Sequence, residues 1–382
     1  MKVLHVIDHM GLGGEQRVVQ DLAVMRAPDV AVAVWSLRSH ELPGTADRMA
    51  AADVPYHTLG FSYGNPFALT SFRRRLREAG PDVLHLHLEY STLVGVVAGL
   101  SLPAPGPILV ASVANDPYRQ GAFHRWAGRR LAPSIDLHMT HSRGIHDSVL
   151  RAYARRPRRV ECVSLGIDLG RFDRALASPE RVADYRRGAG RVVGTIGRLV
   201  PQKAIHVLLD ATPALLHADP ATRVLVVGDG PLRGELEAQA RRLGIAHAVE
   251  FAGYQEDVVS AYAAMDVFVL PSRDEGFGLV FLEAMAVGVP VVGTRVIGSE
   301  DAVKDGATGL LVPYADAPAL AQAVRRLLDD AELRCRLRDT AAERVQRSGS
   351  REQFAAQVEA IYRGLMQSRL ARGPGASVVA GS

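Results

Sequence analysis

The segment of this chain best suited to chemistry reads EGFGLVFLE and runs from Glu275 to Glu283. It follows the apolar run Val267–Leu270, a predicted strand, and its later residues predict a helix that ends at Gly288. Backbone N–H groups in such a loop, at a helix N-terminus, form a ready site for a diphosphate. Glu283 falls about a turn and a half into the helix, where its carboxylate can accept two ribose hydroxyls. Glu275 stays in the loop, where it can contact a sugar.

Other interpretations of the two glutamates fit less well. A glycosidase also uses two carboxylates, but one in a loop and one inside a helix are poorly placed to face a single bond. Solvated surface glutamates are disfavoured by the neighbouring glycines and by the apolar residues around them. The pair therefore predicts a clamp for a sugar nucleotide.

Two cations follow the predicted strand Val192–Ile196. Arg198 can offer a planar fork to phosphate oxygens, and Lys203 a movable point charge. A pair of ordinary surface cations is the alternative. The next predicted strand, Val224–Val227, ends in the turn GDGP, where Gly230 fits either a nucleotide contact or a purely structural turn.

The first predicted strand ends in a glycine turn, GLGG, which includes Gly13 and Gly14. Glycines there let backbone N–H groups approach an anion at the start of the next helix, although a turn without a ligand is equally compatible. The dinucleotide motif G-x-G-x-x-G would require glycine where this chain has Gln16. The turn therefore disfavours an NAD-dependent dehydrogenase.

The elements that position these loops form two series of alternating strands and helices. Nearly continuous apolar runs are typical of parallel strands buried on both faces. Two Rossmann-like parallel α/β domains facing each other across a cleft follow, with ligands beyond the carboxyl ends of the strands. The twelve predicted strands are Val3–Asp8, Val30–Leu37, Val83–Leu88, Ile108–Val113, Leu137–Thr140, Val160–Ser164, Val192–Ile196, Val224–Val227, Val249–Phe251, Val267–Leu270, Val291–Gly293 and Leu310–Val312.

The chain of 382 residues is long enough for two domains. We expect an N-terminal domain over residues 1–170, a linker over 171–190 and a C-terminal domain over 191–351. The helix predicted over residues 352–370 has one apolar stripe, and the Gly/Ala/Ser-rich tail 371–382 is expected to be disordered.

Charge and cysteine content bear on location and partners. The only two cysteines, Cys162 and Cys335, are far apart and predict buried inert thiols in a reducing, cytoplasmic compartment rather than a disulfide framework. Arginines gather in segments 73–77 and 151–159. The simplest interpretation of these arginines is that they lie on solvated helix faces. The alternative, which is more specific, is peripheral contact with an anionic membrane or an anionic acceptor. No recognised motif points to nucleic acid.

With these residues placed, the chain resembles the retaining family-4 glycosyltransferases of GT-B fold. The resemblance spans nearly the whole chain and is most specific over residues 198–298. Its E-x7-E signature is met by EGFGLVFLE, its diphosphate pair by GRLVPQK and its acceptor-side loop by GLGG. The nucleotide-side turn matches VGDGP, and the base-side segment matches FAGY, which ends at Tyr254.

The resemblance implies roles for individual residues. Glu283 would bind the donor ribose, while Glu275 and the backbone of Gly276, Phe277, Gly278 and Leu279 would bind the transferred sugar. The last helix would cross back onto the N-terminal domain. The family often has histidine in the loop after its fifth strand, where this chain has Asn115 or Ala114, depending on the alignment. Asn115 can hydrogen-bond the sugar but cannot act as a base. The glycine that usually follows the diphosphate lysine is Ala204 here. The predicted catalytic set is therefore Arg198, Lys203, Glu275 and Asn115, with Gly13, Gly14, Gly230 and Tyr254 at the donor.

The expected activity is retaining transfer of a sugar from a nucleoside diphosphate sugar, UDP by family frequency, to a hydroxyl acceptor in glycan, glycolipid or natural-product synthesis. The chain has no Asp-x-Asp motif, so no metal and no cofactor beyond the nucleotide sugar is expected. A nucleotide-sugar 2-epimerase and a non-catalytic binding subunit of a glycosylation complex are the alternatives.

Overall fold

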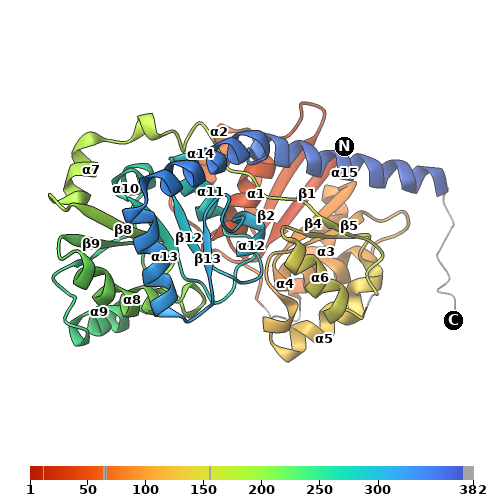
Figure 1. Cartoon of the computed structure of the whole chain (residues 1–382). Coiled ribbons are helices and arrows are strands. Elements are labelled where there is room, and N and C mark those ends of the chain that lie inside the picture. The colour runs from red at the N-terminus through yellow and green to blue at the C-terminus, as the bar shows by residue number, and fades with distance from the viewer. Residues whose placement is uncertain (12, 63–64, 66, 155, 373–382) are drawn as a thin grey trace. The chain divides into compact units, whose positions relative to one another are not determined.

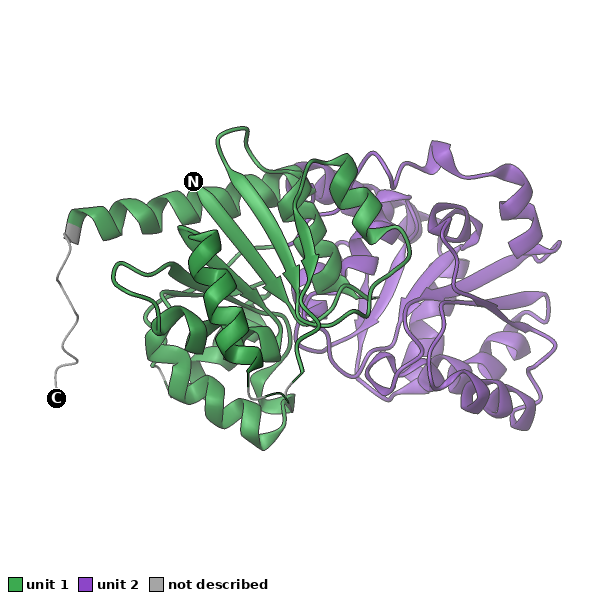
Figure 2. Cartoon of the chain, turned by 180° about the vertical axis from the view of Figure 1, so that it is seen from behind, with its two compact units in different colours: residues 1–164, 351–382 green, residues 165–350 purple. Residues whose placement is uncertain are grey.

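The computed structural model describes residues 1–372 except 12, 63–64, 66 and 155, so most of the predicted tail, residues 373–382, lies outside the described residues. The chain divides into two compact units (Figure 2). Unit 1 comprises residues 1–164 and 351–382, and unit 2 comprises Leu165–Ser350.

Unit 1 is built on a seven-stranded parallel sheet with the order β3-β2-β1-β4-β5-β6-β7. Figure 1 labels four of these strands, β1, β2, β4 and β5. Its strands are β1 (Lys2–Ile7), β2 (Ala31–Ser36), β3 (Tyr56–Thr58), β4 (Val83–His87), β5 (Ile108–Val113), β6 (Leu137–Thr140) and β7 (Val160–Cys162). Its helices are α1 (Gly14–Val24), α2 (Thr45–Ala51), α3 (Ala68–Ala79), α4 (Glu89–Leu100), α5 (Ala122–Leu131), α6 (Arg143–Ala152) and α15 (Arg351–Arg372), with short 3-10 turns η1 (Pro117–Arg119) and η2 (Ala132–Ser134).

Unit 2 repeats the architecture with six parallel strands in the order β10-β9-β8-β11-β12-β13. The strands are β8 (Arg191–Ile196), β9 (Thr222–Val227), β10 (Val249–Gly253), β11 (Val267–Leu270), β12 (Val291–Thr294) and β13 (Leu310–Val312). The helices are α7 (Pro179–Arg186), α8 (Ile205–Ala218), α9 (Arg233–Arg242), α10 (Val258–Ala264), α11 (Leu279–Ala286), α12 (Ser299–Ala302), α13 (Ala317–Asp329) and α14 (Ala331–Ser348), with η3 (Arg174–Leu176) and η4 (Pro201–Lys203).

Burial explains why twelve of these strands could be predicted from the sequence. Central strands such as β4 and β5 are buried at every residue, as expected for parallel strands covered on both faces. The strand that the sequence did not predict is β3, three residues long at the edge of the sheet, where His57 and Thr58 are exposed. An edge strand with one covered face does not need a continuous apolar run.

Each sheet has one position where the strand order reverses direction. In unit 1 it lies between β1 and β4, and in unit 2 between β8 and β11. In open α/β sheets, ligands bind outside the carboxyl ends of the strands at such a switch point. The topology therefore selects the loops after β1 and β4 and the loops after β8 and β11.

The segment 171–190, expected as a linker, contains η3 and α7 and belongs to unit 2. There Arg174 donates hydrogen bonds to the carbonyl oxygens of Val287 and Ala263. The last helix, α15, packs on α1 within unit 1 and remains helical through Arg372. It is held by Glu359, which accepts a hydrogen bond from the Ala27 N–H at 2.7 Å, and by an Arg363–Asp29 pair.

The structure also bears on the cysteines and on membrane-spanning helices. Cys162 and Cys335 are exposed, so the prediction of buried thiols was wrong; each lies at the surface rather than in an apolar core. Over the described residues, no helix is long and apolar enough to cross a membrane.

Candidate functional site

The loops after β8 and β11 are joined by a buried ion pair. Lys203 Nζ lies 2.6 Å from Glu275 Oε1, and their side chains are only 15% and 5% exposed. The Ser272 hydroxyl donates to the same carboxylate oxygen at 2.6 Å. The loops are also tied by Gln202, whose side chain donates to the Asp274 carbonyl oxygen and whose own carbonyl accepts from the Arg273 N–H. Two predicted catalytic residues that are 72 positions apart thus meet directly.

Arg198 differs from Lys203 in its surroundings. Its side chain is exposed and makes no ion pair or side-chain hydrogen bond with any residue that the structure describes. It follows β8 at the carboxyl edge of the sheet, as predicted. Lys203 is already paired with Glu275, whereas the exposed guanidinium of Arg198 is available to bind an anionic ligand from solvent.

The start of α11 presents a row of unsatisfied backbone donors. Within the described chain, no hydrogen-bond acceptor is found for the N–H groups of residues 276–280. Gly278 precedes the helix with φ of 87°, a left-handed conformation that favours glycine. The side chain of Phe277 is 5% exposed, so only its backbone is available to a ligand. This arrangement suits a negatively charged group, because the helix dipole adds to the free N–H groups.

Glu283 is held one and a half turns further along, as a half-buried carboxylate. Its Oε2 accepts a hydrogen bond from the hydroxyl of Tyr262 at 2.8 Å. Tyr262 is fully buried on α10, and burial and the neighbouring carboxylate both raise its pKa well above the usual range. The tyrosine therefore stays a donor and fixes one oxygen of Glu283. Sequence reasoning missed Tyr262, whose position in an alanine-rich helix resembles any core aromatic.

The glycines of the GDGP turn serve close packing of two loops. A Cβ on Gly228 would lie 2.0 Å from the Gly197 carbonyl oxygen, and one on Gly230 would lie 2.5 Å from that of Leu199. The structural interpretation of Gly230 therefore has direct geometric support. Gly298 likewise approaches the Glu275 backbone, with its Cβ position 2.4 Å from that carbonyl oxygen. Tyr254, after β10, is 56% exposed.

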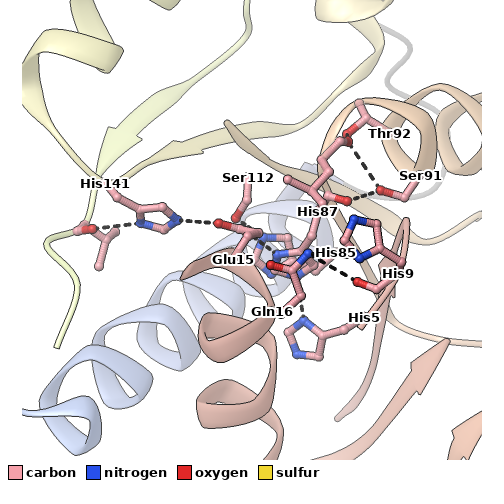
Figure 3. Close-up of polar contacts among 12 residues, drawn as sticks. His5, His9, Glu15, Gln16, His85, His87, Ser91, Thr92, Ser112 and His141 are labelled. Atoms are coloured by element: carbon pink, nitrogen blue, oxygen red, sulfur yellow. Dashed lines mark hydrogen bonds and ion pairs between the residues drawn. The ribbon is translucent and has the colours of Figure 1, made fainter. Parts of the chain in front are cut away.

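A buried polar cluster occupies the switch point of unit 1 (Figure 3). His87 Nδ1 lies 2.7 Å from Glu15 Oε1, and its Nε2 lies 3.0 Å from His5 Nδ1. His85 uses both ring nitrogens, toward the hydroxyls of Tyr362 and Ser112. These bonds fasten α1, through Glu15, and α15, through Tyr362, to the centre of the sheet.

Burial controls the charge of this cluster. Loss of solvent lowers the pKa of His87 to about 3 and lowers the pKa values of His5, His85 and His141 as well. Burial raises the pKa of Glu15, opposed by His141 and by a hydrogen bond from Ser112. The imidazoles are therefore neutral at physiological pH.

The same cluster contains the one group of three candidate metal ligands within the described residues. Nitrogen atoms of His5, His85 and His87 lie within 4.8 Å of one another. Both nitrogens of His85 and of His87 already make hydrogen bonds, so a metal ion would have to break them. In the sequence this cluster is visible as three histidines inside two apolar strands, one in KVLHVI and two in VLHLH. Parallel pairing of β1 with β4 brings these histidines side by side.

The glycine turn after β1 adjoins this cluster. Gly13 precedes α1 and Gly14 is its first residue, while Leu12 lies outside the described residues. The side-chain amide of Gln16 donates to the His9 carbonyl oxygen at 3.4 Å. Asp8 accepts hydrogen bonds from the Ser91 and Tyr90 N–H groups at the start of α4, and burial raises its pKa to about 6. The two loops of the switch point are thereby joined.

Asn115 is exposed after β5, at a pocket between the sheet of unit 1 and α5. Glu89, Thr92 and Gln120 also line this pocket. Two histidines are also among its lining residues: His138 Nδ1 is buried and has no hydrogen-bond partner among the described residues, and the same holds for His124 Nε2. Burial lowers the pKa of His138 to about 4, so the ring is neutral. A hydroxyl group of a bound ligand can form a hydrogen bond with such an unpaired neutral ring nitrogen.

Comparison with known proteins was made after this geometry was described. Residues 12–171 match the family described as Glycosyltransferase Family 4, and residues 190–330 match the family described as Glycosyl transferases group 1. A D-inositol 3-phosphate glycosyltransferase of Streptomyces bingchenggensis is 30% identical over 350 residues, covering 84% of this chain and 74% of that protein. One from Corynebacterium urealyticum is 34% identical over 68% of this chain, and the match spans 65% of that protein, less than two thirds.

Among solved structures, HepE of Anabaena in complex with UDP-glucose has a TM-score of 0.83 to this chain. The alignment covers 95% of this chain and 100% of that one at 21% identity. At this identity the likeness shows the fold, which is the two-unit architecture predicted from the sequence.

Proposed function

We propose that this chain, which belongs to glycosyltransferase family 4 (group 1) and has the GT-B fold, is a retaining, metal-independent enzyme. It moves a sugar from a nucleoside diphosphate sugar, with UDP as the default nucleotide, to a hydroxyl acceptor. It acts in the cytoplasm with peripheral contact to the membrane, and its partners do not include nucleic acid.

The observation that carries the donor assignment is the row of free N–H groups over residues 276–280. It lies on the loop that Lys203 contacts through Glu275, at the switch point of the unit 2 sheet. Together with Arg198, these groups supply positive potential for the diphosphate and for the charge that develops on it as the sugar departs. Preorganised electrostatics of this kind replaces the metal ion of other sugar transferases.

Glu283 and Glu275 make the remaining polar contacts to the donor, one to the ribose and one to the transferred sugar. Because Tyr262 holds one oxygen of Glu283, that carboxylate has a fixed orientation toward the ribose hydroxyls. Glu275 contacts the transferred sugar beside the backbone of residues 276–279. Tyr254 offers an exposed ring on which a base can stack.

The acceptor site belongs to unit 1 in this proposal. Arg38 follows β2 and lies over the ring of Tyr90, 5.2 Å from its centroid, at the ligand edge of the sheet. A guanidinium there can bind an acceptor phosphate. D-inositol 3-phosphate, from the names of the related enzymes, is therefore the first acceptor to test. The pocket at Asn115 provides the hydroxyl contacts.

The proposed chemistry needs no protein base. In a retaining transfer, the acceptor hydroxyl attacks from the side of the leaving group, and the departing phosphate takes its proton. Asn115 then serves to hydrogen-bond a hydroxyl. If Asn115→Ala leaves turnover undiminished, the residue has no part in the reaction.

The donor proposal is tested by calorimetric titration of UDP-, GDP- and dTDP-sugars. The Glu283→Ala variant is expected to lose donor binding, whereas Glu343→Ala, an exposed glutamate on α14 of the same unit, should bind as the unmodified chain does. Unchanged donor affinity in Glu283→Ala would remove the ribose assignment.

Activity assays separate the alternatives. Incubation with donor alone should yield slow hydrolysis and no epimer, since an epimer would favour the 2-epimerase. Transfer by the purified chain excludes a non-catalytic subunit. Turnover should survive treatment with a chelator; activity restored only by Mg²⁺ or Mn²⁺ would refute metal independence.

A further inference from the structure

Helix α5 carries an unusual set of exposed aromatic residues. Phe123 and Trp126 are 58% and 62% exposed, and their ring centroids lie 6.2 Å apart. Tyr118, in the adjoining η1 turn, is 51% exposed. Aromatic residues make up only 6% of this chain, and the other tryptophan, Trp35, is buried. Two large rings side by side in solvent indicate a surface that binds something apolar.

The same segment is strongly basic. Residues 117–135 contain four arginines and no aspartate or glutamate. Arg129 and Arg130, in the last turn of α5, are exposed and have no ion pair among the residues that the structure describes. By contrast, Arg158 and Arg159 of the second predicted arginine segment pair with Asp136 and Glu161. The surface on α5 combines unneutralised charge with two adjoining exposed rings on one helix, whereas the exposed arginines of α3 follow one exposed ring, Phe67.

We propose that α5 is the membrane-contact surface of this protein, and that its partner is an anionic lipid bilayer. Phe123 and Trp126 enter the interfacial region, and Arg129 and Arg130 contact lipid phosphates. A helix with aromatic residues beside arginines is typical of interfacial membrane binding. Single-stranded nucleic acid also binds arginines and exposed rings, so binding of the chain to nucleic acid in preference to anionic vesicles would overturn the proposal.

The position of α5 relates this surface to the acceptor site. Helices that follow parallel strands begin at the carboxyl edge of the sheet, so Phe123 and Trp126 lie near the loop that holds Asn115. The opposite side of α5 lines the pocket through His124, Ala127 and Gly128. One helix thus faces the bilayer on one side and the acceptor pocket on the other, which suits an acceptor carried on a lipid.

This inference refines the peripheral membrane contact proposed above, and its test measures vesicle binding alone. The full chain is sedimented with vesicles of phosphatidylcholine and with vesicles that also contain phosphatidylglycerol. We expect binding only to the anionic vesicles, and weaker binding as salt rises. Arg129→Glu/Arg130→Glu should weaken binding at least about 25-fold, since each arginine near an anionic surface accounts for about fivefold. Phe123→Ser/Trp126→Ser should weaken it at least about tenfold.

Matched controls lie in unit 2. Leu176→Ser removes an equally exposed apolar side chain, and Arg241→Glu/Arg242→Glu reverses an exposed pair at the end of α9. Both should bind vesicles as the unmodified chain does. Equal binding by the α5 variants, equal losses in the controls, or no vesicle binding by the unmodified chain would each overturn the inference. Because sugar transfer to a soluble acceptor is assayed separately, failure of one proposal does not imply failure of the other.

Discussion

A double-mutant cycle on Lys203 and Glu275 tests the central contact of the donor loops. Lys203→Met keeps most of the side-chain length without the charge, and Glu275→Gln keeps the shape and removes the charge. The third variant combines both. The cycle reports whether the two residues act as a unit, which their contact across 72 positions predicts.

The expected magnitude follows from the distance and the burial. At 2.6 Å, the gross attraction is about 6 kcal/mol with an effective dielectric constant of about 20, and desolvation offsets much of it. Removing one partner of a buried pair typically costs about 3–5 kcal/mol. Because Ser272 still donates to Glu275, and Lys203 is 15% exposed, we expect about 2–3 kcal/mol for each single variant. The double variant should lose only about 1–2 kcal/mol, since it leaves no charge unpaired, so the coupling is at least about 2 kcal/mol.

The assay must follow unit 2 separately, because a chain of two units need not unfold in one step. Hydrogen exchange measured by mass spectrometry on peptides from β8 and β11 gives the opening free energy locally. Calorimetric titration with the donor gives the second readout, in which Lys203→Met should bind more weakly. Additive single losses, with coupling below about 0.5 kcal/mol, would show that the contact carries no energy and would refute this account of the loops.

The remaining predictions concern single contacts. Tyr262→Phe should reduce donor affinity and cost about 1.5–3 kcal/mol of stability in unit 2, because it removes a hydrogen bond to a carboxylate; an unaltered donor Kd would contradict this. Gly230→Ala should lower the Tm measured by scanning fluorimetry, since its Cβ would lie 2.5 Å from the Leu199 carbonyl oxygen, whereas Gly234→Ala in α9 meets nothing within 4 Å and should be neutral or stabilising by up to ~1 kcal/mol. His87→Gln should flatten the dependence of stability on pH. The pKa of His87 is about 3 in the folded state and 6.5 in the unfolded state, so between these values the unfolded state binds one more proton. Because of that proton, the stability of the unmodified chain falls from pH 6.5 toward pH 3 by up to ~1.4 kcal/mol per pH unit. Urea midpoints measured between pH 4 and 7 give that slope, and an equal slope in the variant would contradict the assignment.

The sequence indicated the ligand loops because their chemistry is local. A glycine-containing loop between an apolar strand and a helix can be identified without any tertiary contact, and EGFGLVFLE is such a loop. Close approach between loops is not local. Gly298 could not be identified, because its requirement comes from the backbone of Glu275, which reaches it only in the folded unit.

The buried cluster of unit 1 shows the same limit. The histidines of β1 and β4 are visible in the sequence as polar residues inside apolar runs. Their partners Glu15, Ser112 and Tyr362 come from three other elements, and only pairing of β1 with β4 and packing of α15 bring them together. From the sequence alone, α5 with its exposed aromatic face could not be distinguished from an ordinary amphipathic helix.

By itself, the sequence determined the two α/β sheets, the loops that carry ligand chemistry and the family, because alternating apolar periodicity and short motifs depend on neighbouring residues. The tertiary structure decided which loops lie together. Strands β8 and β11 are adjacent although β9 and β10 lie between them in the chain, and this places Lys203 against Glu275. The physical reason is that sheet order is set by the packing of whole helices and strands, a long-range balance that no local pattern of residues specifies.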